Sequence, residues 1–252
     1  VNNLKTTRNE LKKSIQSKEI EVEEGILEDF LYLKNVKNIT NLDEYKKGLF
    51  TMQDESAGLT ALVLNPKEDE YILDCCSAPG GKTTYIAELM NNKGNIVAWD
   101  LYKHRLDKVQ ENSKRLGINI IKTEENDATV LKEEYIEKFD KILIDAPCLG
   151  LGVIKRKPDI KWQRKFEDIE EISKIQEKIL NTCSKYLKKE GILVYSTCSI
   201  IQSENNNIIQ KFIKNNSLKL EEISNLNVEK IQNLITQKGI LKIYPSKNMD
   251  GF

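Results

Sequence analysis

Short apolar runs and helix-length segments alternate along the chain from residue 71 onward. The runs that fit buried strands are Tyr71–Leu73, Ile96–Trp99, Ile118–Ile121, Ile142–Ile144 and Ile192–Tyr195. The segments that fit helices are Thr83–Met90, Lys103–Leu116 and Ile169–Leu187. Strands alternating with helices predict a parallel, doubly wound α/β sheet. Such sheets bind ligands beyond the carboxyl ends of their strands, so the chemistry of this chain is expected in the loops that follow the strands.

Residues 1–55 differ from the rest in being polar and rich in lysine. A helical stretch near Leu4–Ile15 precedes short mixed segments, which indicates a small α/β subdomain. Asp54 or Ser56 is a suitable cap for a helix through Ala61–Leu64, which the following Asn-Pro pair is expected to end. We therefore predict a small subdomain over residues 1–55 and a larger α/β domain over residues 56–252.

Composition limits the partners and the location. Lysine and arginine (39 residues) balance aspartate and glutamate (39 residues), which disfavours a generic charge-driven nucleic-acid binder, so RNA contact must come from local patches. No apolar run could span a bilayer and no export signal opens the chain, so a cytoplasmic monomer without membrane contact is expected. The chain starts at Val1 and stops at Phe252, which indicates a fragment cut at both ends.

Five cysteines occur without any CxxC pair, at Cys75, Cys76, Cys148, Cys183 and Cys198. With His104 as the single histidine, this set offers no metal-ligand spacing, so no metal is expected. Free cysteines are usually packing residues, and Cys75 and Cys183 need no other role. His104 is expected at the surface.

Two glycines occur in the loop between the first strand and its helix. The loop reads Asp74-Cys75-Cys76-Ser77-Ala78-Pro79-Gly80-Gly81-Lys82-Thr83. Glycines let the backbone approach a ligand closely, and the helix N-terminus behind them offers free N–H groups. The end of the loop fits a phosphate-binding P-loop, but the first glycine of that motif would fall on Cys76, and the GxGxxG fingerprint is absent. A P-loop ATPase that uses Lys82 and Asp145 stays an alternative.

Asp100 ends the next strand. A carboxylate in that place can accept hydrogen bonds from both ribose hydroxyls of a nucleoside, as S-adenosylmethionine would offer without a tight phosphate cradle. The alternative is that Asp100 only caps the following helix, and the two interpretations are evenly balanced.

Two further strands each end beside a cysteine. Lys141–Ile144 leads into Asp145-Ala146-Pro147-Cys148, and Ile192–Tyr195 leads into Ser196-Thr197-Cys198-Ser199. One such cysteine alone indicates core packing, whereas two opposite a nucleoside loop favour chemistry. A thiolate that adds to C6 of cytosine lets C5 attack a methyl sulfonium, after which a second group must remove the C5 proton. Asp145 could hydrogen-bond to the ring edge, and Lys82 either adds positive charge or is merely solvated.

These motifs resemble those of the RNA 5-methylcytosine methyltransferases. The resemblance is carried by Asp74–Thr83, Asp145–Cys148 and Ser196–Ser199 and extends over the whole chain. Gln53–Ala57 (QDESA) and Val153–Trp162 (VIKRKPDIKW) are most similar to the bacterial Sun/RsmB-type enzymes of small-subunit ribosomal RNA. The resemblance implies a seven-stranded, Rossmann-like S-adenosylmethionine-dependent methyltransferase sheet after a small RNA-binding subdomain. It also implies cytosine C5 methylation of ribosomal RNA, with transfer RNA as an alternative substrate.

The resemblance implies roles for single residues. Cys198 is the nucleophile, and Cys148 assists release of the product, with Asp145 and Lys82 beside them. The implied S-adenosylmethionine site comprises Cys76, Ser77, Ala78, Pro79, Gly80, Gly81, Lys82, Asp100, Arg105, Asp127 and Asp145, with Asp127 on the adenine side. Leu149 replaces a serine common in the family, which puts a loop hydrogen bond in doubt. The sheet is expected to lack its last strand.

A basic segment surrounds Trp162 after the Cys148 loop. Its predicted RNA-binding residues are Lys155, Arg156, Lys157, Lys161 and Arg164. These charges can bind phosphates, whereas for Trp162 itself packing against protein is favoured over stacking on a base. A non-catalytic RNA-binding or assembly module with the same fold is the remaining alternative.

Overall fold

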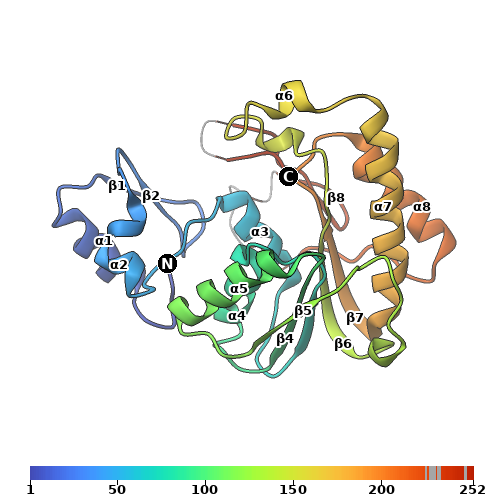
Figure 1. The fold of residues 1–252 in the computed structure, drawn as a ribbon, viewed down its shortest axis with the longest axis horizontal. Helices are drawn as coiled ribbons and strands as arrows, with labels where there is room; N and C mark the ends of the chain where they lie inside the picture. Colours follow the sequence, from blue (N-terminus) through green and yellow to red (C-terminus); the bar gives the residue numbers. More distant parts are fainter. Residues whose placement is uncertain (225, 227–230, 232–233, 247–248) are drawn as a thin grey trace.

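A parallel five-stranded sheet forms the centre of the computed structural model, which describes residues 1–224, 226, 231, 234–246 and 249–252 (Figure 1). In the order β5-β4-β3-β6-β7 the strands are Ile121–Glu125, Asn95–Asp100, Tyr71–Asp74, Phe139–Asp145 and Leu187–Ser196. The first strand of this sheet along the chain, β3, lies between β4 and β6, so the direction of winding reverses there. Loops on the two sides of such a reversal diverge, which is where open α/β sheets bind ligands.

Helices cover both faces of the sheet (Figure 1). One face carries α3 (Glu55–Leu64), α4 (Gly81–Leu89) and α5 (Lys103–Leu116), and the other carries α7 (Glu167–Cys183) and α8 (Asn206–Asn215). Successive side chains of a strand point to opposite faces. Ile72 therefore packs in the cluster of α4 while Leu73 packs in that of α7, and both are fully buried.

A small lobe precedes α3 and lies beside the end of α5 (Figure 1). It contains α1 (Arg8–Gln16), α2 (Asp43–Lys46) and the hairpin of β1 (Val22–Glu24) and β2 (Leu31–Leu33), around a core of its own. The guanidinium of Arg115, in the last turn of α5, donates 2.9 Å hydrogen bonds to the carbonyls of Tyr45 and Phe50 and stacks on the Tyr45 ring. The lobe is thus fixed to the larger domain by buried backbone contacts.

The C-terminal segment folds back over the loops at the carboxyl edge of the sheet. The loop that follows β6 leads into the short helix α6 (Ile160–Gln163). Much later, after β8 (Ile235–Gln237) and β9 (Ile240–Leu241), the chain returns to that loop. The Gly251 N–H donates to the Gly152 carbonyl (2.9 Å), and the Gly152 N–H donates to the Cys198 carbonyl (2.9 Å). Phe252 and Ile243 exchange two backbone hydrogen bonds.

The predicted α/β class and parallel sheet are confirmed, as are α5 and the capping of α3 by Asp54, which accepts from the Ser56 N–H (2.9 Å). The strand expected at Ile118–Ile121 is wrong, because the Ile118 N–H still bonds to the Ser113 carbonyl at the end of α5 and the strand starts at Ile121. The resemblance implied a sheet of seven strands, whereas the central sheet of the described residues has five. Beyond β7 lies a groove of about 1310 Å³ rather than a further described strand.

Within the described part of the chain, no helix has both the length and the apolar character that crossing a membrane requires.

Substituting Gly48 by alanine should weaken the packing of the lobe against the end of α5 and lower the stability of the protein. Gly48 has φ +72°, and a Cβ there would lie 1.9 Å from the Arg115 carbonyl oxygen. We expect Gly48→Ala to lower the free energy of unfolding by about 2–4 kcal/mol, since both the backbone conformation and the contact oppose a side chain. Urea unfolding measures the loss, and Gly81→Ala is the control, because its Cβ would meet no atom closer than 3.7 Å. Equal stability of the two variants would contradict the interpretation.

Candidate active site

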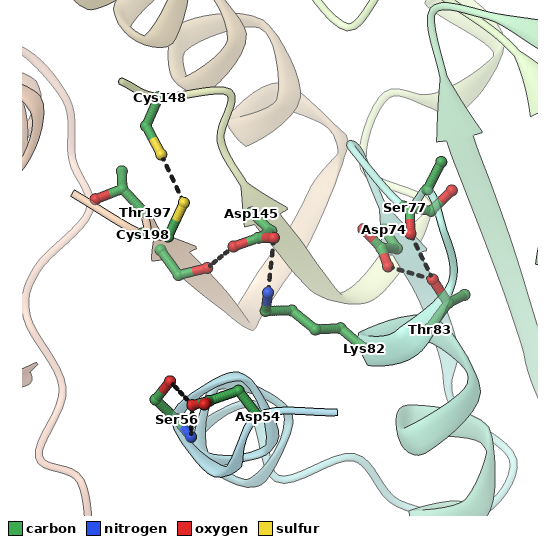
Figure 2. Close-up of polar contacts among 12 residues, drawn as sticks. Asp54, Ser56, Asp74, Ser77, Lys82, Thr83, Asp145, Cys148, Thr197 and Cys198 are labelled. Atoms are coloured by element: carbon green, nitrogen blue, oxygen red, sulfur yellow. Dashed lines mark hydrogen bonds and ion pairs between the residues drawn. The ribbon is translucent and has the colours of Figure 1, made fainter. Parts of the chain in front are cut away.

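Two cysteines from different loops face each other beyond the carboxyl ends of β6 and β7 (Figure 2). Their sulfur atoms, Cys148 Sγ and Cys198 Sγ, lie 3.1 Å apart, and both thiols are free. The strands are parallel neighbours that pair Asp145 with Ser196, so the two loops start side by side. Both cysteines lie beyond strand ends as expected, and the structure adds that their sulfur atoms meet.

The two thiols have unequal acidity. The hydrogen bond from Cys148 and the positive charge of Lys82 lower the pKa of Cys198, although burial acts against them. The same hydrogen bond, together with burial, raises the pKa of Cys148. The thiolate is the nucleophilic form of cysteine. Of the two thiols, the arrangement therefore favours Cys198 as the one that ionises, with a neutral Cys148 donating a hydrogen bond to it.

An ion pair lies next to the thiols. Asp145 Oδ2 accepts from Lys82 Nζ (2.7 Å), and Asp145 Oδ1 accepts from Ser196 Oγ (2.8 Å) (Figure 2). The Phe252 ring centre lies 4.7 Å from Lys82 Nζ. Lys82 is therefore an engaged side chain and not a freely solvated one, and it holds the Asp145 carboxylate in a single orientation.

Buried polar atoms without a partner gather around the glycine turn and the end of β5. Among the described residues they include Ser77 Oγ, Asp74 Oδ1 and the amide nitrogen of Asn126. Asp74 Oδ2 accepts from the Thr83 hydroxyl (2.7 Å), and Gly80 has φ +102°. Buried polar groups are normally paired, so these atoms indicate a site that is completed by a polar ligand.

Asp100 and Arg105 tie the glycine turn to the next strand. Asp100 is 3% exposed, and its carboxylate accepts from Nη1 of Arg105. The second terminal nitrogen of Arg105, Nη2, donates to the Ala78 carbonyl (3.2 Å). Asp100 also accepts from the N–H of Tyr102, the residue before α5, so it does not cap the amides inside the helix. Asp127 is exposed, and its carboxylate accepts from the Thr129 N–H (2.8 Å), while the adjoining Asn126 points its side chain inward.

The comparison with protein families places this site in context. A family model described as 16S rRNA methyltransferase RsmB/F matches residues 61–252, which contain the glycine turn, the ion pair and both cysteines. The chain belongs to the RsmB/F methyltransferase family. This membership displaces the P-loop ATPase alternative, in which Lys82 would have to face phosphates.

Two curated relatives show the range of the family. The chain is 43% identical over 215 residues to the probable ribosomal RNA small subunit methyltransferase B of Bacillus subtilis, a match that covers 85% of this chain and 48% of the relative. It is 41% identical over 187 residues to the tRNA (cytosine(72)-C(5))-methyltransferase of Pyrococcus horikoshii, covering 74% of this chain and 47% of the relative. The chain thus spans about half the length of the curated relatives it matches.

Solved structures share the whole fold. The crystal structure of NSun6 from Pyrococcus horikoshii with SFG superposes with a TM-score of 0.87 at 26% identity, covering 100% of this chain and 87% of that one. A methyltransferase homolog protein from Pyrococcus horikoshii superposes with a TM-score of 0.81 at 32% identity, covering 100% and 82%. The lobe and the sheet of this RsmB/F chain therefore both occur in known relatives.

The basic segment is only partly free to bind a ligand. Arg156 forms an ion pair with Asp250, Arg164 Nε donates to the Leu149 carbonyl (3.3 Å), and Lys155 donates to the Ser246 carbonyl (3.3 Å). Lys157 and Lys161 are exposed. The expectation that Trp162 packs against protein is wrong, since it is 88% exposed. The short helix α6 buries Ile160, which leaves the residue two positions later on the solvent side.

The predicted core positions of Cys75 and Cys183 and the surface position of His104 are confirmed. In the described ranges, no three potential metal-ligating side chains lie together. The predicted site residues did not include Asp74, Asn126 or Glu204, although Asp74 opens the glycine loop of the resemblance and ends a buried strand in the same way as Asp145. The position of Asp74 at a strand end could have identified it from the sequence, whereas no sequence pattern marked Glu204.

Replacing Asp74 by asparagine should change how stability depends on pH. Burial raises the pKa of Asp74 from 3.8 to about 7, with the Thr83 hydrogen bond acting against the shift. Between about pH 4 and 7 the folded state then holds a proton that the unfolded chain releases, so stability from this group falls as pH rises. Asp74→Asn lacks that loss and should gain stability relative to wild type between pH 5 and 8 in urea unfolding. A stability difference that stays constant over this interval contradicts the shift.

Proposed function

We propose that this chain forms the catalytic part of an RNA methyltransferase that transfers a methyl group from S-adenosylmethionine to C5 of cytosine. The pair of free thiols 3.1 Å apart, beside the Lys82–Asp145 ion pair, is the observation that carries the proposal. Membership of the RsmB/F family supports it. We propose small-subunit ribosomal RNA as the substrate, because relatives at 37–43% identity are named for it, while a transfer-RNA enzyme at 41% marks the alternative.

The residues around the glycine turn fit S-adenosylmethionine. When bound, this cofactor supplies an electrophilic methyl group on a sulfonium. The unpaired atoms of Asp74 and Ser77 offer an acceptor and a hydroxyl next to the backbone of Gly80, and Asp100 offers a buried carboxylate suited to ribose hydroxyls. Asn126 and Asp127 would face the adenine. The NSun6 relative was solved with SFG, an analogue of this cofactor, in the same fold.

The thiols divide the chemistry. Cys198 thiolate would form a bond to C6 of the base, which makes C5 a carbon nucleophile. Bound S-adenosylmethionine would supply its sulfonium methyl group to C5, and the electron pair of the broken methyl–sulfur bond would stay on the departing thioether. Asp145 holds the ring edge by hydrogen bonding, with Lys82 fixing its carboxylate. The C5 proton must then leave so that the S–C6 bond can break. The proposed chemistry needs no metal, since the thiolate supplies the nucleophile.

Cys148 is suited to the release step because its acidity depends on its neighbour. In the free enzyme the hydrogen bond to Cys198 is the largest of several effects that raise the pKa of Cys148 and keep it neutral, burial and the charge of Glu204 being others. Once Cys198 carries the base as a thioether, the largest of these effects is removed, and Cys148 can give its proton to solvent. Cys148 thiolate then takes the C5 proton, the S–C6 electron pair returns to Cys198, and the resting pair is restored.

Trapping with 5-fluorocytosine tests the assignment of the two thiols. Fluorine at C5 cannot leave as a cation, so wild type should form a stable protein–RNA adduct, which denaturing gel electrophoresis detects. Cys198→Ala should abolish the adduct, while Cys148→Ala should accumulate adduct even on unmodified RNA, because release is blocked. Cys183→Ala, in the core, is the thiol control. An undiminished adduct in Cys198→Ala refutes the assignment, and RNA binding without methyl transfer by wild type favours a non-catalytic module.

We propose that RNA is held by the basic segment and by residues 1–55. The cations are Lys155, Arg156, Lys157, Lys161 and Arg164, and two exposed aromatic side chains, Trp162 (88%) and Phe166 (84%), lie among them. Exposed rings beside cations are the combination that stacks on unpaired bases while phosphates are neutralised. The segment lies against the catalytic loops, since Arg164 bonds to Leu149 and a Cβ at Gly150 would lie 3.3 Å from Ile160. We further propose that the enzyme acts as a monomer in the cytoplasm.

Substitutions in this segment should separate stacking from charge. Trp162→Ala should weaken RNA binding by about 1–3 kcal/mol at every salt concentration, because a stacking contact is lost. Lys157→Ala should reduce the salt dependence of the affinity by about one unit of slope, because one phosphate contact is lost. Fluorescence anisotropy with a single-stranded RNA measures both, with Val130→Ala as an exposed apolar control. An unchanged affinity of Trp162→Ala excludes the stacking contact.

A further inference from the structure

Two chemically identical thiols in contact do not by themselves determine which one carries the negative charge. We propose that Glu204 is the positioning residue that makes this choice: its buried carboxylate joins the two cysteine loops and keeps Cys148 neutral, which leaves the charge to Cys198. The proposal rests on the proposed function, because the division of labour between the thiols matters only for that chemistry.

Glu204 bridges the two loops directly. It ends the short 3₁₀ turn Gln202–Glu204 before α8 and is 0% exposed. Its Oε2 accepts from the Leu149 N–H (2.9 Å), and its Oε1 accepts from the Ser199 hydroxyl (2.6 Å). These donors are the residues that follow Cys148 and Cys198, so a single carboxylate holds the chain just beyond each sulfur.

Neighbouring amides hold the other side of each cysteine. The Gln176 side chain of α7 donates both to Glu204 Oε2 (3.1 Å) and to the Pro147 carbonyl (2.8 Å). Asn205 accepts from the Thr197 hydroxyl (2.6 Å) and donates to the Ser199 carbonyl (2.7 Å). Pro147 and Thr197 precede the two cysteines, so both loops are clamped on each side, and the sulfur separation follows from this clamp.

The bridge does not require a particular side chain at position 149. A serine there was expected to provide a loop hydrogen bond. Glu204 instead accepts from the backbone N–H of Leu149, which any residue other than proline provides, and the leucine side chain is 2% exposed. The bond between Glu204 and this N–H therefore does not depend on the side chain at position 149.

The negative charge of Glu204 has no cationic partner among the described ion pairs. Burying a carboxylate is costly even with three donors, and a glutamine of the same shape would avoid that cost. The charge is therefore expected to act on its surroundings. Its charge adds to the Cys198 hydrogen bond and the burial that raise the pKa of Cys148, whereas the charge of Lys82 helps the Cys148 hydrogen bond to lower the pKa of Cys198.

The other charged or titratable groups around the pair do not produce this difference. Asp145 of β6 raises the pKa of both thiols. Tyr195 of β7 is a neutral phenol whose hydroxyl donates to the Glu204 carbonyl (2.9 Å). Arg164 donates to the Leu149 carbonyl, and its cation would favour charge on Cys148. Beside the hydrogen bond between the thiols, Glu204 and Lys82 thus act with opposite sign, Glu204 on Cys148 and Lys82 on Cys198.

Thiol labelling in the full-length protein tests the proposal without RNA or methyl donor. Iodoacetamide reacts with thiolates, so the labelling rates of the Cys198 and Cys148 peptides, followed by mass spectrometry from pH 6 to 9, report where the charge lies. Wild type should label Cys198 faster by at least about tenfold, the effect of one pKa unit on a thiolate fraction. Glu204→Gln should lose most of this preference. Glu177→Gln, which changes a half-buried glutamate next to Gln176 that pairs with Lys211, should keep it.

Two further variants distinguish charge from shape. Ser199→Ala removes one hydrogen bond to Glu204 but keeps the carboxylate, so the preference for Cys198 should persist. Glu204→Asp also retains the charge, so the preference for Cys198 should persist in it as well. This outcome can be measured even if Glu204→Gln does not fold. Equal labelling of both thiols in wild type, an unchanged preference in folded Glu204→Gln, or its loss in Ser199→Ala or Glu204→Asp overturns the proposal. A normal labelling pattern in a protein that forms no 5-fluorocytosine adduct would instead sink the proposed function and leave the role of Glu204 intact.

Discussion

Two thiols that approach within 3.1 Å in a largely buried setting can carry at most one negative charge between them, because a second charge at that distance is opposed by repulsion and by the loss of water. Much of the architecture around the carboxyl edge serves this contact. The parallel register of β6 and β7 starts both loops at one level, and the side chains of Glu204, Asn205 and Gln176 hold the residues that flank each sulfur. The proton between the two sulfurs is thereby given a defined donor and acceptor.

The glycine turn opposite the thiols is built in a different way. It leaves buried polar atoms unpaired at Asp74 and Ser77, which destabilises the ligand-free fold. The surrounding packing offsets this cost, since Ile72 and Leu73 of the preceding strand are fully buried on opposite faces of the sheet. A site that is satisfied only by a ligand gains binding energy from those same atoms, so the local loss in stability is a condition of recognition.

Distant segments of the chain converge on the same edge. Asp54 of the QDESA motif accepts from the Asp250 N–H, and Asp250 pairs with Arg156 of the basic segment. Gly251 bonds to Gly152, which in turn bonds to the carbonyl of Cys198. The capping of α3, the basic segment and the nucleophile loop are therefore mechanically linked, and a ligand on the basic segment rests on the loops that carry the chemistry.

The sequence by itself determined the elements and the kind of chemistry. Periodicity reports short-range packing, so the alternation of strand and helix, the cap at Asp54 and the cysteines at two strand ends were all readable. It misplaced the start of β5, because Ile118 still bonds to Ser113 at the end of α5, and it misjudged the environment of Trp162, because the side that a four-residue helix buries depends on what the helix packs against. Only the tertiary structure decided that Lys82 meets Asp145 and that Glu204 joins both cysteine loops. Those contacts depend on strand order and register, which bring together residues about 50 or more positions apart that no local pattern relates.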